Sequence, residues 1–447
     1  MSDEPKASTM IPGLVRIVAY VLLAVGPVVL AALLGLMPRS VVYELGRFCA
    51  LAGFALLALQ FLLAARIRWI ERPFGFDILI RFHRHMAILA TALIVAHPLL
   101  LAAGGAGTDL LLGLDQPWAV WLGKAALVLL LLNVLLSVFQ RRVALDFEHW
   151  RLLHDILGPL VLVGAAVHAW AWGQDLRLFP LQVTWIIVTA VALGTYVVHR
   201  FVRPWWLAGR PYRVSAVRPE ADGVWTIEFT PPEGLPPLDY LPGQFHFVTF
   251  FRGRELPVEE HHWTISSSPT TDHLASTIKA VGDFTSTIGE TRVGDTAAVH
   301  GPFGRYSYVL HPEERDLVFV AGGIGITPLM SMLRHMRDTR DERSVRLVYA
   351  NRTESSIVFR GEIDEMATGE HPRLRVTHVL SRPGDEWTGR RGHVDTSLLR
   401  EICGNQPESE VFYVCGPTPL RSAVIASLHE LGVPDSRIRI EIFSFLD

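Results

Sequence analysis

The sequence predicts a multidomain membrane protein, in which a six-helix transmembrane bundle precedes a soluble part made of an antiparallel β-barrel and a doubly wound α/β domain. Composition is the first observation: 50% of the 447 residues are hydrophobic, 19% are charged, and the mean hydropathy is +0.30, which is high for a soluble protein. Distribution is the second, because the apolar residues are concentrated between Ile11 and about Arg203, and an ordinary soluble composition follows from about Arg210.

Composition also excludes several classes of protein. A formal net charge of -3 is not that of a basic nucleic-acid-binding protein, so no nucleic acid is expected among the partners. The three cysteines, Cys49, Cys403 and Cys415, are too few for a disulfide scaffold of this size and form no CxxC metal pair. The chemistry must therefore come mainly from other residue types.

Six apolar segments are each near or above the ~20 residues that a helix needs to cross a bilayer. They cover about 11–37, 41–67, 77–103, 117–139, 149–172 and 181–202. The first is too long for a removable signal peptide and lacks a cleavage site. Arginine is concentrated in alternate connections, at Arg66, Arg68, Arg72, Arg81 and Arg84, then Arg141, Arg142 and Arg151, then Arg200, Arg203, Arg210 and Arg213. The positive-inside rule then predicts a multi-pass protein of the plasma (inner) membrane with both termini in the cytoplasm.

Four histidines in the third and fifth segments are the first candidates for chemistry. His83 and His97 are fourteen residues apart, and so are His154 and His168. This spacing places each pair on one helix face, ~21 Å apart along the axis. The two segments run in the same direction, so His83 is level with His154, and His97 with His168. Facing imidazoles at two levels suit two haems with two histidine ligands each; the alternatives are hydrogen bonds between helices or a proton path.

Other polar residues of the apolar half are expected to support this arrangement. His85, His149 and His199 are predicted to be structural or interfacial, although His85 lies where it could touch a haem propionate. Arg47 lies inside the second segment, where a buried arginine usually faces a partner. We expect it to pair with a propionate of the outer haem, and the alternative is that it extends to the outer lipid headgroups.

The soluble half follows a linker at about 205–211 and has two parts. Its first part shows strand alternation between turn residues, which predicts a small antiparallel barrel: YRVSAV, GVWTIEFT and YLPGQFHFVTF. Its second part alternates strands and helices, as in a doubly wound sheet: DLVFVAGGIGITPLMSMLRHM, SVRLVYANRT, LRVTHVL and VFYVCGPTPLRSAVIASL.

Two strand ends of this second part are candidate nucleotide contacts. In LVFVAGGIGITP a strand runs into Gly322, Gly323 and Gly325 and then a helix, which lets a pyrophosphate approach the backbone and the helix N-terminus. The alternative is a plain strand-to-helix turn. A later strand ends at Cys415 and Gly416, at the sheet edge where ligands bind, so this thiol is placed near a nicotinamide, whereas Cys403 is expected to be inert.

These motifs, in this order, resemble the ferric reductase and NADPH oxidase superfamily, and more closely its compact bacterial NADPH oxidase members. In the apolar half the resemblance rests on DILIRFHR at 77–84, AHP at 96–98, WRLLH at 150–154 and VHA at 167–169. In the soluble half it rests on PGQF at 242–245, HHWTISS at 261–267, KAVGDFT at 279–285, GPFG at 301–304, GGIGITP at 322–328 and CGP at 415–417. It implies that the soluble half is a ferredoxin-reductase-like module.

The resemblance implies a role for each matching residue. Trp263 would pack against the isoalloxazine of FAD and Thr264 would hydrogen-bond near N5. The remaining FAD contacts would be His261, Ser266, Lys279, Gly282, Phe284 and Thr285. The nicotinamide nucleotide would be held by Gly322, Gly323, Gly325, Thr327, Cys415 and Gly416. Thr264, Cys415 and Phe443 are the catalytic candidates.

Three positions qualify the resemblance. Phe443, favoured over Phe445, would cover the flavin as a gate, and the alternative is that it simply edges the last strand. His262 replaces a proline of the family motif, which is expected to loosen a turn. Leu101 stands where some eukaryotic oxidases carry a second histidine near the outer ligand, so the electron acceptor is not carried over.

Arg352 is the candidate selector of the nucleotide. It follows the strand RLVYA, where a basic side chain pairs with the 2′-phosphate of NADPH. The alternative is a solvated surface arginine, with NADH as the second possible donor.

The expected organisation is a tail at 1–10, a six-span haem domain at 11–204, an FAD-binding barrel at 208–308 and an NADPH-binding domain at 309–447. The leading hypothesis is an NADPH oxidase that passes electrons through FAD and two b-type haems to oxygen outside the cytoplasm. The alternatives are a ferric- or cupric-chelate reductase, and an electron donor for an extracytoplasmic partner protein. The lipid bilayer is the one obligatory partner besides these small molecules.

Overall fold

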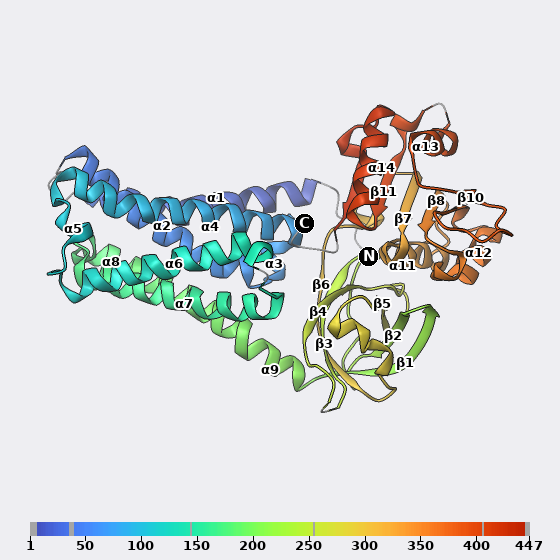
Figure 1. The fold of residues 1–447 in the computed structure, drawn as a ribbon, viewed down its shortest axis with the longest axis horizontal. Coiled ribbons are helices and arrows are strands. Elements are labelled where there is room, and N and C mark those ends of the chain that lie inside the picture. Colours follow the sequence, from blue (N-terminus) through green and yellow to red (C-terminus); the bar gives the residue numbers. More distant parts are fainter. Residues whose placement is uncertain (1–6, 35–39, 144, 254, 405, 443–447) are drawn as a thin grey trace. The chain divides into compact units, whose positions relative to one another are not determined.

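The computed structural model describes residues 7–34, 40–143, 145–253, 255–404 and 406–442. The chain divides into two compact units, Met1–Arg203 and Pro204–Asp447 (Figure 1). The first unit is helical and the second contains both sheets.

Within the described residues, six helical stretches are long and apolar enough to cross a membrane, which confirms the predicted number. They are built from α1 (Ala7–Leu34), α2 (Val41–Ala64), α4 (Phe76–Leu101), α6 (Trp118–Val143), α7 (Phe147–Trp172) and α8 (Phe179–Val197). Two short helices, α3 (Arg68–Glu71) and α5 (Asp109–Leu112), lie in the connections. The last span is longer than predicted, because a π-helical turn at Val198–Val202 joins α8 to α9 (Arg203–Ala208).

Two helix pairs organise the bundle. α2 packs along α4, and α6 packs along α7. α2 is the central helix, since 61% of its most apolar window is buried, against 11–17% in the other spans. Leu51, Phe54 and Ala58 of α2 contribute to one buried cluster with Leu162 of α7 and Trp185 of α8. The exposed apolar faces of the outer helices are those that a bilayer would cover.

The first sheet of the second unit is an antiparallel barrel. Its strands are β1 (Tyr212–Ala221), β2 (Val224–Thr230), β3 (Phe245–Phe251), β4 (Glu260–Thr264), β5 (Leu274–Lys279) and β6 (Thr296–Phe303), in the order β4-β3-β6-β1-β2-β5. The two edges meet just after β4, where the Ser266 amide donates to the Ala275 carbonyl at 2.7 Å. A short helix, α10 (Asp283–Ser286), follows β5.

The second sheet is parallel and doubly wound. Its strands are β7 (Asp316–Gly322), β8 (Ser344–Asn351), β9 (Arg373–Leu380), β10 (Arg390–Arg391), β11 (Val411–Cys415) and β12 (Ile438–Glu441), in the order β10-β9-β8-β7-β11-β12. One face packs on α11 (Ile326–Asp338) and α12 (Arg360–Thr368), and the other on α13 (Thr396–Cys403) and α14 (Thr418–Glu430). This arrangement places the ends of β7, β8 and β11 at one edge, where nucleotides bind in such folds.

Candidate functional site

The four paired histidines occupy two facing helices, as their spacing predicts. His83 and His97 lie on α4, and His154 and His168 lie on α7. The imidazole rings of His83 and His154, here called the first pair, have centroids 6.3 Å apart and planes at 69°. His97 and His168 form the second pair. Two metal–imidazole bonds of ~2 Å each would bring facing ring centroids to about this separation, so the first pair fits a metal ion held between its rings.

Hydrogen bonds fix the orientation of three of these rings. Nδ1 of His97 lies 3.0 Å from the Gly46 carbonyl of α2, and Nδ1 of His168 lies 2.7 Å from the Ala119 carbonyl of α6. Nδ1 of His154 lies 3.0 Å from Oδ1 of Asn133, also on α6. An oxygen acceptor at Nδ1 keeps the proton there and leaves the Nε2 lone pair free, which is the usual arrangement of metal-ligating histidines.

The His168 ring of the second pair also needs the space left by a glycine of α6. A Cβ built on Gly123 of α6 would lie 2.7 Å from Cε1 and Nδ1 of His168, so glycine leaves the space that this ring occupies. Gly123 is four residues after Ala119, whose carbonyl holds the same ring. One face of α6 therefore both admits and orients His168. The sequence analysis did not identify Gly123, because a glycine within an apolar run carries no distinctive pattern.

Arg47 has partners that the sequence analysis did not consider. Its guanidinium forms a two-point ion pair with Asp175, in the connection that follows α7, and a further ion pair with Glu44. Nε of Arg47 lies 3.1 Å from Oδ2 of Asp175. These contacts tie α2 to a segment 128 residues away and satisfy the buried charge without a propionate.

The three remaining histidines of this region bond locally. Nδ1 of His85 lies 2.7 Å from the Arg81 carbonyl in the same helix, and His149 pairs with Asp146 at the start of α7. His199 lies beside Arg203, with its Nδ1 at 3.2 Å from the guanidinium. They take no part in the paired arrangement.

In the second unit a cavity of about 240 Å³ brings together residues from both sheets. The barrel contributes His261, Trp263, Thr264 and Lys279, all predicted FAD contacts. The α/β sheet contributes Ile324 and Thr327 from the glycine turn, and Glu441 and Ile442 from the last strand. Predicted flavin and nucleotide residues therefore line one cavity, as hydride transfer between two cofactors requires.

Aromatic packing holds the barrel wall of this cavity. Phe284 of α10 is buried, with its ring centroid 4.3 Å from that of His261 and 5.9 Å from that of Trp263. Nε2 of His261 lies 2.9 Å from Glu259. The Thr285 hydroxyl accepts from the Gly282 amide at 2.9 Å and so shapes the turn itself.

Two expectations for this region are corrected. Ser266 has no exposed surface, and its hydroxyl bonds the Ala275 carbonyl at 3.2 Å and the Thr277 hydroxyl at 2.9 Å. It therefore closes the barrel and does not line the cavity. His262 loosens no turn, because it lies in β4 in regular register with Phe247 of β3.

Close approach of two loops explains Gly325 of the nucleotide turn. A Cβ on Gly325 would lie 2.4 Å from the Cys415 carbonyl oxygen and 2.7 Å from Cα of Gly416. The turns after β7 and β11 thus touch backbone to backbone at the carboxyl edge. The Cys415 side chain is fully buried in the core, and burial raises the pKa of its thiol well above the ordinary value. Cys415 therefore contributes backbone to this edge, and its thiol does not reach the cavity.

The candidate nucleotide selector has a neighbour that the sequence analysis missed. Arg352 follows β8, and its carbonyl accepts from the amide of Arg382, which follows β9, at 2.8 Å. Both arginines are exposed at the same sheet edge. Parallel pairing of β8 and β9 would have revealed this proximity only if the strand register were known. The predicted gate, Phe443 or Phe445, lies outside the described residues.

A buried histidine predicts a pH response of the barrel. His246 of β3 has no exposed surface, its Nε2 lies 2.6 Å from the Ser276 hydroxyl, and burial lowers its pKa to about 3. The unfolded chain takes up this proton near pH 6.5, whereas the folded barrel does not, so stability falls as pH falls from 6.5 towards 3. We expect a loss of about 2 kcal/mol between pH 7.5 and pH 5 from this group.

Thermal unfolding of the full chain in detergent, followed through flavin release at several pH values, measures this effect. His246→Gln should flatten the decline below pH 6.5. Equal pH dependence in the wild type and His246→Gln would show that His246 does not cause it.

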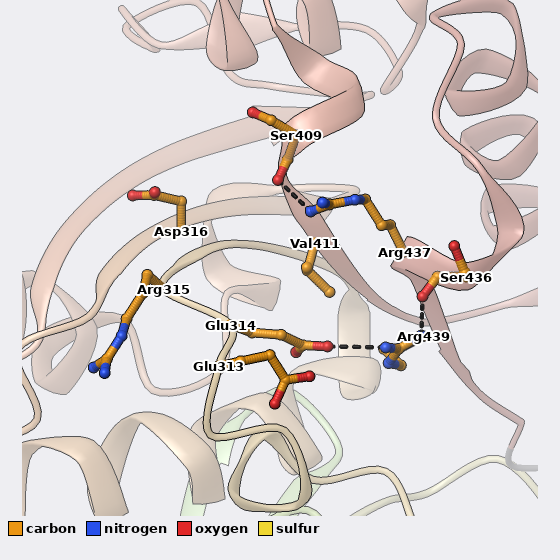
Figure 2. A pocket seen from close by; sticks show the side chains of 9 residues that line it. All are labelled: Glu313, Glu314, Arg315, Asp316, Ser409, Val411, Ser436, Arg437 and Arg439. Atoms are coloured by element: carbon orange, nitrogen blue, oxygen red, sulfur yellow. Dashed lines mark hydrogen bonds and ion pairs between the residues drawn. The ribbon is translucent and has the colours of Figure 1, made fainter.

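A second cavity of the second unit lies elsewhere. It measures about 410 Å³ and lies at the amino ends of β7, β11 and β12, opposite the glycine turns (Figure 2). Figure 2 shows Arg439 reaching Glu314, which also accepts from the Tyr413 hydroxyl at 2.8 Å. His311, Glu313 and Glu314 are close enough to hold a cation, but Glu314 is already engaged by these two donors. We assign no site here.

Comparison with protein families identifies both halves. Residues 49–165 match the ferric reductase like transmembrane component, and residues 319–425 match the oxidoreductase NAD-binding domain. The transmembrane match precedes the nucleotide-domain match along the chain, in the order that the sequence motifs predict. The chain belongs to the ferric reductase and NADPH oxidase superfamily. The match to the transmembrane component and the six long apolar helices among the described residues make this chain a multi-pass membrane protein.

Three curated relatives of this chain are reductases by name. Cytochrome b5 reductase 4 of Rattus norvegicus is 36% identical over 164 residues, covering 36% of this chain and 31% of the relative. NADH-cytochrome b5 reductase 2 of Mus musculus is 33% identical over 176 residues, covering 36% of this chain and 64% of the relative. The glycine betaine monooxygenase reductase subunit of Chromohalobacter salexigens is 33% identical over 212 residues, covering 46% of this chain and 56% of the relative. The chain thus spans less than two thirds of each relative.

Two solved structures are similar to this chain at TM-scores below 0.5. Flavohemoglobin from Malassezia yamatoensis has a TM-score of 0.48 and 18% identity, covering 82% of this chain and 98% of that chain. The CS-b5R domains of human Ncb5or have a TM-score of 0.46 and 25% identity, covering 52% of this chain and 68% of that chain.

Proposed function

We propose that this chain is a transmembrane NADPH oxidase, which passes electrons from cytoplasmic NADPH through FAD and two b-type haems to oxygen on the outer side, with superoxide as the product. One observation carries the proposal: two levels of histidines on α4 and α7, three of them oriented by an oxygen acceptor at Nδ1. Bound haem would supply single-electron carriage, and bound FAD would convert hydride transfer into single-electron steps.

The chain's own residues have distinct tasks in this scheme. His83 and His154 would ligate one haem, and His97 and His168 the other. Trp263 and Thr264 line the cavity where the flavin ring would lie, and Ile324 and Thr327 face it from the nucleotide side. Cationic Lys279 lies in the same cavity and suits a phosphate group. Each task is binding or orientation, which is what a protein contributes to cofactor chemistry.

Arg352 and Arg382 are the proposed determinants of nucleotide choice. Two guanidinium groups on adjacent strand ends suit the 2′-phosphate that distinguishes NADPH from NADH. We expect Arg352→Ala to lower the NADPH-to-NADH ratio of kcat/KM roughly tenfold, as the loss of one charge-assisted hydrogen bond predicts, and Arg352→Ala with Arg382→Ala to lower it further. Stopped-flow reduction of the flavin by each nucleotide measures both ratios.

Arg360→Ala is a matched control for this test, because Arg360 is engaged with Glu354 in the same domain. It should leave the ratio unchanged. An unaltered ratio in the double variant would assign nucleotide selection to other residues.

The acceptor is tested with purified full-length protein in detergent. With NADPH and oxygen, cytochrome c reduction that superoxide dismutase abolishes supports the oxidase. A ferric- or cupric-chelate reductase is the second candidate, because residues 49–165 match the ferric reductase like family. Anaerobic reduction of ferric citrate, without superoxide in air, would establish that candidate instead. Reduced haems that react with neither acceptor would point to an extracytoplasmic partner protein.

A further inference from the structure

The acceptors that orient the paired histidines repeat the spacing of the histidines themselves. On α6, Ala119 faces His168 and Asn133 faces His154, and these two positions are fourteen residues apart. Because α6 packs along α7, each level of α7 meets one residue of α6 that can accept from Nδ1. The two levels nevertheless differ chemically. Ala119 uses its backbone carbonyl, which no substitution removes, whereas Asn133 uses its side chain.

The side chain of Asn133 is positioned to accept a hydrogen bond from His154. Its side chain is buried, at 8% exposure, and Oδ1 lies 3.0 Å from Nδ1 of His154. The Ser137 hydroxyl lies farther from Nδ1 of His154, at 3.4 Å. That hydroxyl already donates to the Asn133 carbonyl at 2.8 Å and accepts from the Trp150 indole at 3.2 Å. Asn133 is therefore the main acceptor for His154.

We propose that Asn133 is a positioning residue that holds the His154 ring as an Nδ1–H donor and thereby lowers the reduction potential of the haem iron in the first pair. This rests on the proposed function, since it requires that the first pair holds haem. A hydrogen bond from Nδ1–H makes the imidazole a more basic ligand. A more basic ligand stabilises ferric iron more than ferrous iron.

The test is a spectroscopic redox titration of the purified holoprotein. Asn133→Leu removes the acceptor, and we expect the reduced-to-oxidised ratio of one haem at fixed potential to rise about tenfold, which is ~59 mV for one electron. Asn133→Asp places a stronger acceptor of similar shape at the same point and should shift that haem in the opposite direction. The haem of the second pair should titrate as in the wild type in both variants, which a general loss of structure would not produce.

Thr91→Val is the matched control. Thr91 of α4 is a buried polar residue of the same bundle, and its hydroxyl bonds the Ala87 carbonyl of its own helix at 2.8 Å. This variant should move neither potential. Wild-type potentials for both haems in Asn133→Leu, or equal shifts of both, would overturn the assignment.

Two further outcomes are decisive. If Asn133→Leu does not retain the haem, Asn133→Asp decides, and an unchanged or raised potential there rejects the role. If the wild-type protein contains two haems and the variants fail these tests, only the role of Asn133 is lost. A wild-type preparation that takes up no haem overturns the proposed function and this role together.

Discussion

Replacement of His97 by leucine should remove one of the two proposed haems per chain. His97 is a half-buried ring on α4, oriented by the Gly46 carbonyl towards the level of His168, and leucine offers no ligand atom. The haem of the first pair should remain, because its ligands lie fourteen residues away on both helices. FAD content should be unchanged, since the barrel belongs to the other unit. The pyridine haemochrome assay and flavin absorbance measure the two contents.

His85→Leu is the matched control for His97→Leu. His85 lies on the same helix, is exposed, and bonds only the Arg81 carbonyl among the contacts described, so this variant should keep both haems. Two haems in His97→Leu, or the same loss in His85→Leu, would contradict the assignment of the second pair.

Gly325→Ala should weaken the binding of NADPH, the proposed donor, by about fivefold to a hundredfold. The added Cβ would lie 2.4 Å from the Cys415 carbonyl oxygen, so the turns after β7 and β11 must separate. Overpacking of this kind costs about 1–3 kcal/mol. The displaced turn carries Ile324 and Thr327, which line the cavity. Flavin and haem contents should be retained, and dithionite should still reduce all centres. Titration of the flavin spectrum with NADPH measures the affinity.

Gly361→Ala provides the control for Gly325→Ala. Gly361 lies in α12 of the same domain, and a Cβ there meets no atom within 4 Å. Alanine is the better helix former, so this variant should bind NADPH normally and be slightly more stable. Normal NADPH affinity in Gly325→Ala would show that close approach of the two turns does not shape the nucleotide site.

Local periodicity explains what could be predicted. Six apolar runs fix the spans, because a helix must satisfy its own backbone in a bilayer and needs a set length to cross it. The fourteen-residue interval places His83 and His97 on one face of α4 for the same geometric reason. Strand alternation predicted the barrel, and the strand–glycine–helix pattern located the turn after β7. These inferences depend only on residues that are close to one another in the sequence.

Long-range packing decided the rest. Asn133 contacts His154 because α6 packs along α7. Arg47 forms an ion pair with Asp175, which is 128 residues away in the sequence. Neither partnership leaves a local signal. Ser266 and Cys415 belong to motifs that suggest cofactor contact, yet their side chains are fully buried by neighbouring strands and helices.

The sequence by itself thus determined which elements form and on which helix faces the four histidines lie, because helical and strand repeats are set by backbone geometry within each segment. The tertiary structure alone decided which oxygens orient three of the imidazoles, which arginine lies beside Arg352, and which motif side chains reach the cavity. Those choices depend on the register between elements distant in sequence, and register follows from how complete surfaces pack.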